Sequence, residues 1–446
     1  MKALGLIIII IFSTCVVYAQ QKELTFTEAV TIGLSDNVIM KNTRNNLRSF
    51  KTAKNAQVLS FTPNLGISSG VSQTSGPQID QEQGLINSTT SSFRASIGSN
   101  LVLYNGNNRI HALKASKYRL ESQQLLIDRT EQDIINQVAL QFLQVLLDQE
   151  LLKISEENLV TQQRTLDEIT GFVEAGIRPE VDRYRQDADV KSFELLVIRA
   201  KNNLSNDKSA LALTLQLDPS EDFIVVRPGW NIDKIRVTEY NLAELYALAL
   251  SNRPDYKRLE SEEKASQHDY KRAFNSYMPF LSGFGTFGST YFNDNDDATP
   301  TDPFPDQLTS RRSTSYGLNL TIPLWDRLQT RNNRVFTKVN YENAVNNVDN
   351  LEKTVKIEVQ IAHNNYTDVK AGYAVSLAQY DASKLAYETQ QESYTVGIAT
   401  QVELAIANAS FVGAQANLAQ TGYRLLFQKI LLDYATGVLA KEGIEN

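Results

Sequence analysis

The chain has 446 residues, of which 42% are hydrophobic and 21% are charged, and its formal net charge is −7. This length is enough for two or three ordinary domains, and a mean hydropathy of −0.30 excludes a membrane protein built from helices. The mild acidity and the lack of a basic stripe give no reason to expect a nucleic-acid partner.

The first 19 residues have the pattern of a secretory signal peptide. Lys2 is followed by an apolar run over 4–17, and small residues up to Ala19 form a cleavage site. The alternative is a lipoprotein in which Cys15, the one cysteine, is acylated, although Thr14 is larger than the residue expected before it. Cleavage after Ala19 predicts an exported chain without cysteine and therefore without disulfides. Because no later apolar run approaches 18 residues, any further membrane crossing must use strands.

The rest of the chain is a tandem repeat. At an offset of 216, the segment 60–65 matches 276–281, including a proline in each copy. At an offset of 221, Gly176-Ile177 matches Gly397-Ile398. We therefore expect a first repeat over 20–223, a linker over 224–240 and a second repeat with a C-terminal tail over 241–446.

In the first repeat, a helix is predicted over 27–61 and Pro63 ends it. Alternating side chains predict strands over 64–71 and 93–103, separated by a polar loop over 74–90. A long helix over 107–170, a tight turn and a helix over 180–215 complete the repeat.

The second repeat has the same order. We predict a helix over 244–278, a strand over 281–292 with aromatic residues on both faces, an acidic loop over 293–306 and a strand over 315–324. A long helix over 328–393 and a helix over 401–436 follow. Both long helices carry apolar residues every seventh position with one four-residue step, which in the second copy ends on Tyr366, Tyr373, Tyr380, Tyr387 and Tyr394.

These elements require neighbours. A helix over 107–170 is about 95 Å long, which is too long for one chain to cover with a globular core. Four strands cannot close a barrel, for which roughly eight is the smallest number with a filled interior. An open sheet in lipid leaves backbone groups unpaired at several kcal/mol each, so strands that enter lipid must be pooled between subunits.

The duplicated helix–hairpin–long-helix unit resembles the TolC family of outer-membrane efflux proteins. The features that carry the resemblance are the leader, the proline at each helix-to-strand corner and the G-I-x-x-x-V-[DE] motif at each helical turn, and they span essentially the whole mature chain. The resemblance implies a mainly α fold with transmembrane β: a homotrimer with a 12-stranded outer-membrane barrel and an α-helical periplasmic tunnel. It also implies a periplasmic adaptor (membrane fusion protein) and an inner-membrane transporter of the RND, ABC or MFS type, and no cofactor.

The resemblance places a constriction near the turns. Tyr394 matches a gate tyrosine and Asp182 its acidic partner, while Glu403 matches a residue that rings the constriction. A second ring position falls on Ile406 and a latch arginine on Ala399, so this chain departs from the family there. Tyr394 is also the last residue of the tyrosine series, which plain packing explains equally well, and Glu403 suits a solvated carboxylate at a helix start.

Gly176 and Gly397 suit the left-handed position that ends a helix, and Pro179 suits the first turn of the next helix. In the family, the same turns meet the tips of the adaptor. Ile177 and Ile398 are therefore the expected contact residues.

Other functions fit less well. Gly283, Gly285 and Gly288 match a dinucleotide fingerprint, but they lie in a strand and no helix follows. The acidic loop over 293–306 lacks the glycine and closing glutamate of a calcium loop. No acid–base or nucleophile group suggests an enzyme. The main alternative is a soluble periplasmic coiled-coil scaffold or adaptor, which leaves the strands unexplained.

Overall fold

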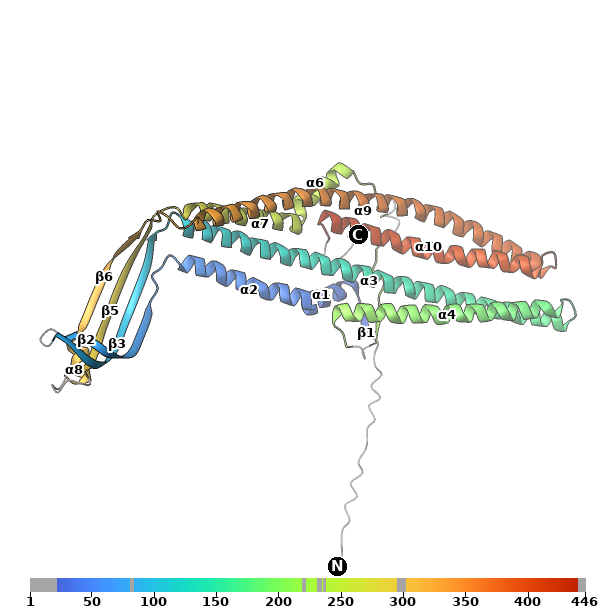
Figure 1. The fold of residues 1–446 in the computed structure, drawn as a ribbon. Coiled ribbons are helices and arrows are strands. Elements are labelled where there is room, and N and C mark those ends of the chain that lie inside the picture. The colour runs from blue at the N-terminus through green and yellow to red at the C-terminus, as the bar shows by residue number, and fades with distance from the viewer. Residues whose placement is uncertain are drawn as a thin grey trace, which may run out of the picture. The chain divides into compact units, whose positions relative to one another are not determined.

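A computed structural model describes residues 22–80, 84–218, 222–230, 235, 238–294 and 302–439. The predicted leader and Cys15 lie outside these ranges. The chain divides into two compact units: unit 1 contains 1–41, 130–253 and 355–446, and unit 2 contains 42–129 and 254–354. Each unit takes parts of both sequence repeats, because the two longest helices, α3 (Asn108–Glu174) and α9 (Gln329–Thr395), contribute to both (Figure 1).

Unit 1 holds the two turns predicted between the paired helices. α4 (Glu180–Leu215) follows α3, and α10 (Gln401–Thr436) follows α9. The short strands β1 (Lys22–Leu24) and β4 (Phe223–Val225) pair in parallel, and α1 (Phe26–Asp36) and α6 (Leu242–Asn252) complete the unit. The ranges of α4 and α10 confirm the predictions for 180–215 and 401–436.

The core of unit 1 is aliphatic and aromatic. In the middle of α3, Val138, Phe142 and Leu143 are fully buried, and the ring of Phe142 meets Phe26 edge to face at 5.5 Å. Burial of a side chain of this size stabilises the fold by about 1.5–3 kcal/mol. Several members of the predicted heptad series are only half-buried, and those that are buried in this unit include Val138 and Val145 of α3 and Val355, Val359 and Tyr366 of α9.

Two predicted helices are each interrupted. The prediction of one helix over 27–61 is wrong, because α1 ends at Asp36 and α2 (Val38–Leu59) begins after Asn37. The Asn37 side chain accepts hydrogen bonds from the amides of Ile39 and Met40, at 2.9 and 3.4 Å, and so caps a new helix. The helix predicted over 244–278 is also split, because Pro254 has no amide hydrogen to continue α6 and instead begins α7 (Pro254–Asn275).

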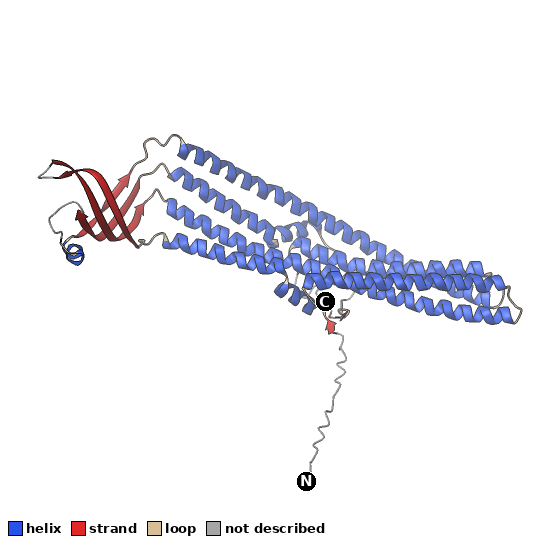
Figure 2. Cartoon of the chain, turned by 60° about the horizontal axis from the view of Figure 1, so that its bottom comes forward, coloured by secondary structure: helices blue, strands red, loops and turns tan. Residues whose placement is uncertain are grey.

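Unit 2 contains the antiparallel sheet, in the order β2-β3-β5-β6, at the ends of its helices (Figure 2). The strands are β2 (Gly66–Asp80), β3 (Gly84–Tyr104), β5 (Phe280–Asp294) and β6 (Arg312–Thr321). The prediction of a polar loop over 74–90 is wrong, since Ser75 pairs with Thr89 inside the sheet and their hydroxyls are 3.0 Å apart. A helix that the sequence did not predict, α8 (Phe304–Ser310), lies against β5.

The sheet has one largely apolar face. Ile67, Ile97 and Phe287 lie in register across β2, β3 and β5, and so do Leu101, Gly283 and Leu318 across β3, β5 and β6. The other face carries paired serines, with 2.9 Å between the hydroxyls of Ser68 and Ser96. β5 has aromatic residues on both faces, as predicted. Within the described ranges, no helix is both long and apolar enough to cross a membrane.

Candidate functional site

The two turns of unit 1 have the same backbone structure. Gly176 and Gly397 adopt φ values of +72° and +85°, in the left-handed region that glycine tolerates best. In the first turn the Ile177 amide donates to the Phe172 carbonyl at 2.9 Å, and in the second the Ile398 amide donates to the Ser393 carbonyl at 3.0 Å. These bonds are those of a Schellman motif, which satisfies the last carbonyls of α3 and α9.

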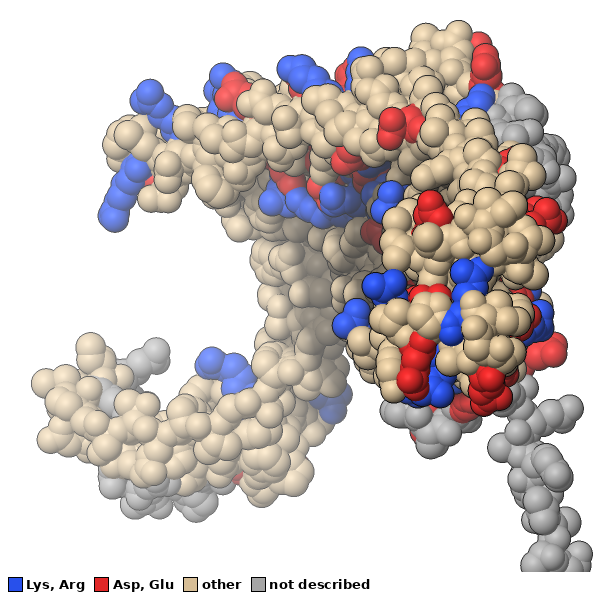
Figure 3. Space-filling view, turned by 90° about the vertical axis from the view of Figure 1, so that its right-hand side faces the viewer, with Lys and Arg blue, Asp and Glu red and all other residues tan. Residues whose placement is uncertain are grey.

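The turns expose apolar side chains. Ile177 is 67% exposed and Ile398 is 83% exposed. Figure 3, viewed from the end of the chain that carries the turns, shows acidic and basic side chains interspersed over the nearer helices. The turns therefore present isoleucines within a surface of mixed charge.

Behind the turns lies a small buried cluster. It joins the end of α3, through Ile169, with Tyr394 of α9 and with Ala399 and Leu404 at the start of α10. Tyr394 is 4% exposed, and burial raises the pKa of its hydroxyl. Among the described residues that hydroxyl has no hydrogen-bond partner. Inside the chain, Tyr394 is thus a packing residue with an unused polar group.

Arg178 of the first turn binds Tyr394 of the second hairpin. Its guanidinium group lies 4.5 Å from the centre of the Tyr394 ring, and its Nη2 donates to the Tyr394 carbonyl at 2.8 Å. The sequence repeat pairs Arg178 with Ala399, the position where the family resemblance places a latch arginine. The arginine that contacts Tyr394 therefore comes from the first turn.

Asp182 is near this cluster but does not bond to Tyr394. It is 7% exposed, and its negative charge contributes to the raised pKa of Tyr394. Since the Tyr394 hydroxyl is unpaired within the described residues, the predicted contact between the two side chains is not made inside one chain.

Glu403 caps α10. Its Oε2 accepts from the Thr400 amide at 2.8 Å and from the Thr400 hydroxyl at 2.9 Å, while the Thr400 hydroxyl accepts from the Glu403 amide at 3.3 Å. These bonds form a capping box and lower the pKa of Glu403. The carboxylate is nonetheless exposed, so it also places negative charge at the surface beside the turn.

Ile406 lines a groove between α4 and α10. The side chain is 62% exposed, and the groove has a volume of about 410 Å³. Asp189 also lines it, and burial raises the pKa of that carboxyl group. Ile406 is therefore available to a neighbouring surface.

Sequence reasoning missed a buried set of three glutamines beside the cluster. The Gln186 Nε2 donates to the Gln162 carbonyl at 3.1 Å and to its Oε1 at 2.9 Å, and the Gln401 Nε2 donates to the Gln186 Oε1 at 2.7 Å. Their exposed fractions are 1%, 5% and 4% for Gln186, Gln162 and Gln401. This glutamine relay joins α3, α4 and α10. The signal was present, because Gln186 lies four residues after Asp182 and four before Val190 on one buried helix face.

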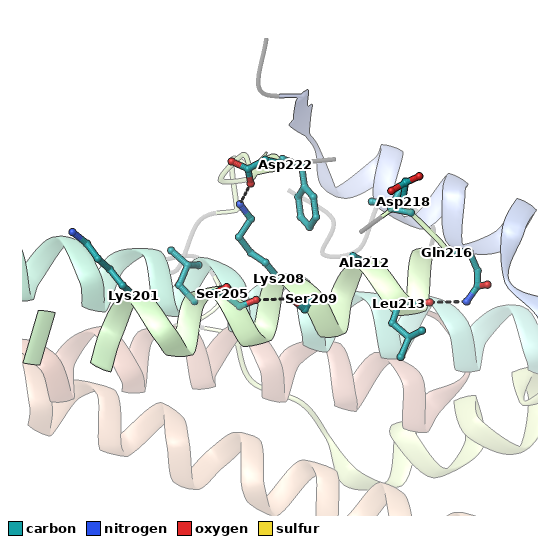
Figure 4. Close-up of a pocket in the computed structure, with 12 residues that line it drawn as sticks. Lys201, Ser205, Lys208, Ser209, Ala212, Leu213, Gln216, Asp218 and Asp222 are labelled. Carbon is teal, nitrogen blue, oxygen red and sulfur yellow. Dashed lines mark hydrogen bonds and ion pairs between the residues drawn. The ribbon is translucent and has the colours of Figure 1, made fainter. Parts of the chain in front are cut away.

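One further pocket of unit 1 lies away from the turns. A surface pocket of about 590 Å³ runs along α4 beside β4 and contains an ion pair between Lys208 and Asp222 (Figure 4). The lining side chains named in Figure 4 show no arrangement of acid, base and nucleophile. Throughout the described ranges, no group of three or more His, Cys, Asp or Glu side chains could hold a metal ion.

Comparison with known proteins identifies the family. The sequence model described as "Outer membrane efflux protein" matches residues 35–215 and 245–438, which covers both repeats. The chain belongs to this family. Its members are outer-membrane transport channels rather than enzymes, and the predicted TolC-like character is confirmed.

Solved structures of such channels have the same fold. The outer-membrane channel OprN is 18% identical, covers 94% of this chain and 90% of its own, and gives a TM-score of 0.79. VceC from Vibrio cholerae is 12% identical, the match covers 92% of this chain and 96% of VceC, and the TM-score is 0.80. MtrE from Neisseria gonorrhoeae, solved in its open state, is 16% identical, the match covers 92% of this chain and 88% of MtrE, and the TM-score is 0.76. A comparison with curated proteins by sequence gives no match. The predicted fold class, long paired helices with a four-stranded sheet, is confirmed, and β1 and β4 form a further two-stranded sheet that the sequence did not predict.

Proposed function

We propose that the chain is one third of a homotrimeric export duct whose strands form a 12-stranded barrel in the outer membrane. The observation that carries this proposal is the four-stranded sheet of unit 2, which has an apolar face and two unpaired edges, β2 and β6. Apolar residues on these edge strands are highly exposed: Ile67 and Val71 on β2 are each 79% exposed, and Leu318 on β6 is 69% exposed.

An isolated sheet of this kind is unstable in lipid. The backbone groups along β2 and β6 that face away from the sheet have no partner within it, and each costs several kcal/mol in hydrocarbon. Pairing β2 of one chain with β6 of the next satisfies both edges at once. Three chains then give a closed barrel without any open edge.

The helices form the periplasmic part of the duct. We propose that the duct is passive and that an inner-membrane transporter of the RND, ABC or MFS type supplies the energy through a periplasmic adaptor. Ile177 and Ile398, exposed on glycine-ended turns, are the proposed contacts for the adaptor. Burial of two such side chains against apolar tips contributes about 1.5–3 kcal/mol each.

The turn end is the proposed constriction. The Tyr394 hydroxyl is buried and has no hydrogen-bond partner among the described residues, so we propose that a rearrangement of the turn end pairs it with a carboxylate such as Asp182, while Arg178 holds the Tyr394 ring in place. The exposed Glu403 carboxylate gives the entrance a ring of negative charge, and Ile406 makes its wall apolar. A charge-assisted hydrogen bond of about 1.5–3 kcal/mol suits a contact that must reopen.

Membrane fractionation tests this function against a soluble periplasmic scaffold. Bacteria expressing the full chain are lysed, and the envelope is washed with high salt and separated into inner and outer membranes. The duct stays in the outer-membrane fraction and resists the wash. Release of the protein into the soluble fraction would instead support the scaffold.

A further inference from the structure

Basic residues collect where the helices of unit 2 meet the sheet. The segments considered are the eleven residues of each helix that lie nearest the strands: 49–59 of α2, 108–118 of α3, 265–275 of α7 and 329–339 of α9. Together they contain one acidic residue, Asp269, and ten basic residues, which we call the basic collar: Lys51, Lys54, Arg109, Lys114, Lys117, Lys271, Arg272, Arg331, Arg334 and Lys338.

The net charge of the collar segments is opposite in sign to that of the whole chain. With neutral histidines, the four segments carry a net charge of +9, whereas the whole chain carries −7. The segments extend about 17 Å from the strands at 1.5 Å per residue. The Debye length is about 8 Å at physiological ionic strength, so the charges closest to a membrane surface act on it most strongly and those at the far end of the segments are largely screened.

Contacts within the chain account for some of these charges. Arg109 donates to the Ser60 carbonyl at 2.5 Å and to the Val102 carbonyl at 2.6 Å, and its guanidinium group lies over the Phe61 ring. The Arg334 guanidinium lies 4.7 Å from the centre of the Phe274 ring. These two arginines help to fix the helix-to-strand corners.

The rest of the collar has few internal counter-charges. Asp269 is bound by Arg119, outside the collar, and lies 3.9 Å from Arg272, so its charge is already shared. Among the described residues, Lys51, Lys54, Lys114, Lys117 and Arg331 form no ion pair. Their positive charges are therefore available to an external anion.

Two histidines of the same helix segments lie close to collar lysines. The Nδ1 atoms of His111 and His268 are 3.1 Å apart, between α3 and α7. The pKa of each is lowered, first by burial and then by positive charge, with Lys114 and Lys271 contributing in both cases. The lysine contribution is the smaller one, and it has the sign expected beside a surface that attracts anions.

From this arrangement we infer that the basic collar binds the headgroups of anionic phospholipids in the membrane leaflet that faces the helices. The inference rests on the proposed function, which puts the strands in that membrane. The chemistry is that of a polybasic surface beside a membrane-spanning segment, where each Lys or Arg near the lipid contributes about 1 kcal/mol of attraction. Leu324 and Trp325, 92% and 76% exposed in the middle of the β6–α9 connection, suit the apolar boundary just beside those headgroups.

Trp325 also provides the measurement. The chain contains two tryptophans, and Trp230 lies in unit 1, so Trp230→Phe leaves Trp325 as the only one. The full mature protein with this change is inserted into phosphatidylcholine vesicles that contain phosphatidylglycerol. Two vesicle samples contain the same mole fraction of brominated lipid, with the bromine near the headgroup. In one sample the phosphatidylglycerol is brominated, and in the other an equal share of the phosphatidylcholine is. The quenching of Trp325 fluorescence is compared between the two samples.

The expected result is that brominated phosphatidylglycerol quenches as if it were enriched about fivefold next to Trp325, the factor that corresponds to about 1 kcal/mol. High salt should reduce the enrichment toward unity. A collar variant should lose the enrichment of phosphatidylglycerol at low salt. In this variant four exposed residues that form no ion pair within the described part of the chain are changed to glutamine: Lys51, Lys114, Lys117 and Arg331. A matched variant should keep the enrichment. In this variant four exposed basic residues of unit 1 are changed to glutamine: Lys153, Arg164, Arg199 and Lys384.

Equal quenching by the two lipids in the unaltered collar would overturn the inference while leaving the barrel intact. The same would follow if the collar variant kept the enrichment, or if the matched variant lost it to the same degree. Quenching by neither lipid would mean that the sheet does not enter the membrane, and would overturn the proposed function as well.

Discussion

Replacement of Gln186 by leucine should loosen the turn end of unit 1. Gln186 is 1% exposed and makes three hydrogen bonds, two to Gln162 and one from Gln401. Leucine fills a similar volume but cannot make any of them, so polar groups of Gln162 and Gln401 lose their partner inside the protein. Since an unsatisfied buried polar group costs about 1–3 kcal/mol, we expect the free energy of local opening at this site to fall by about 2–3 kcal/mol.

Hydrogen exchange measured by mass spectrometry reports this local opening directly. A fall of about 2–3 kcal/mol corresponds to exchange that is roughly 30- to 150-fold faster, and it should appear in peptides from the ends of α3, α4 and α10 beside the turns. Peptides from the sheet of unit 2 should be unchanged. The control is Gln163→Leu, one residue from Gln162 but exposed. Acceleration below about threefold, or equal acceleration in the control, would refute a stabilising role for the glutamine relay.

Three further predictions concern charge and conductance. Tyr394→Phe combined with Asp182→Ala should raise single-channel conductance in planar bilayers if these side chains close the turn end, and unchanged conductance would exclude them from the constriction. Glu403→Gln keeps a side chain that can complete the capping box but removes its charge, so the cation preference of the channel, measured as a reversal potential, should fall. Because the pKa of Glu403 is lowered, the unaltered protein should keep its cation preference from pH 8 to pH 5. Loss of the preference over that range would contradict a role for Glu403 in the constriction. Burial, together with a hydrogen bond and the charge of Asp207, raises the pKa of Asp148 from 3.8 to about 7, so the folded state holds the proton more tightly and the free energy of unfolding should decline as pH rises from about 4 to about 7. In thermal unfolding, Asp148→Asn should lack that decline and should be more stable than the unaltered protein at pH 8 by on the order of 2–4 kcal/mol. Identical pH profiles of the two proteins would show that Asp148 does not titrate near neutrality.

The sequence predicted the long helices well because their signals are redundant. Heptad spacing, capping residues and the turn glycines all agree, and the ranges of α4 and α10 follow as predicted. The breaks at Asn37 and Pro254 were missed because apolar periodicity continues across them, although both residues are typical of helix starts. The strand segments over 74–80 and 84–90 were missed because their side chains are mostly polar on both faces, so no period-2 signal is visible.

The candidate site was only partly readable. Gly176 and Gly397 could be placed because a left-handed residue after a helix favours glycine. The contact of Arg178 with Tyr394 could not be predicted, since it joins two hairpins whose relative position is a tertiary property. The repeat did offer a clue, because Arg178 and Ala399 occupy equivalent positions and only one of them can supply a cation.

Electron microscopy of the detergent-solubilised protein, with its mass determined on the same sample, tests the central claim most directly. The helices α3 and α9 have 67 residues each, so either one spans about 100 Å. The account predicts a hollow particle with threefold symmetry, more than about 100 Å long once the sheet is added, and a mass of three mature chains. A solid rod, or a mass of one or two chains, would contradict the closed barrel and favour the scaffold.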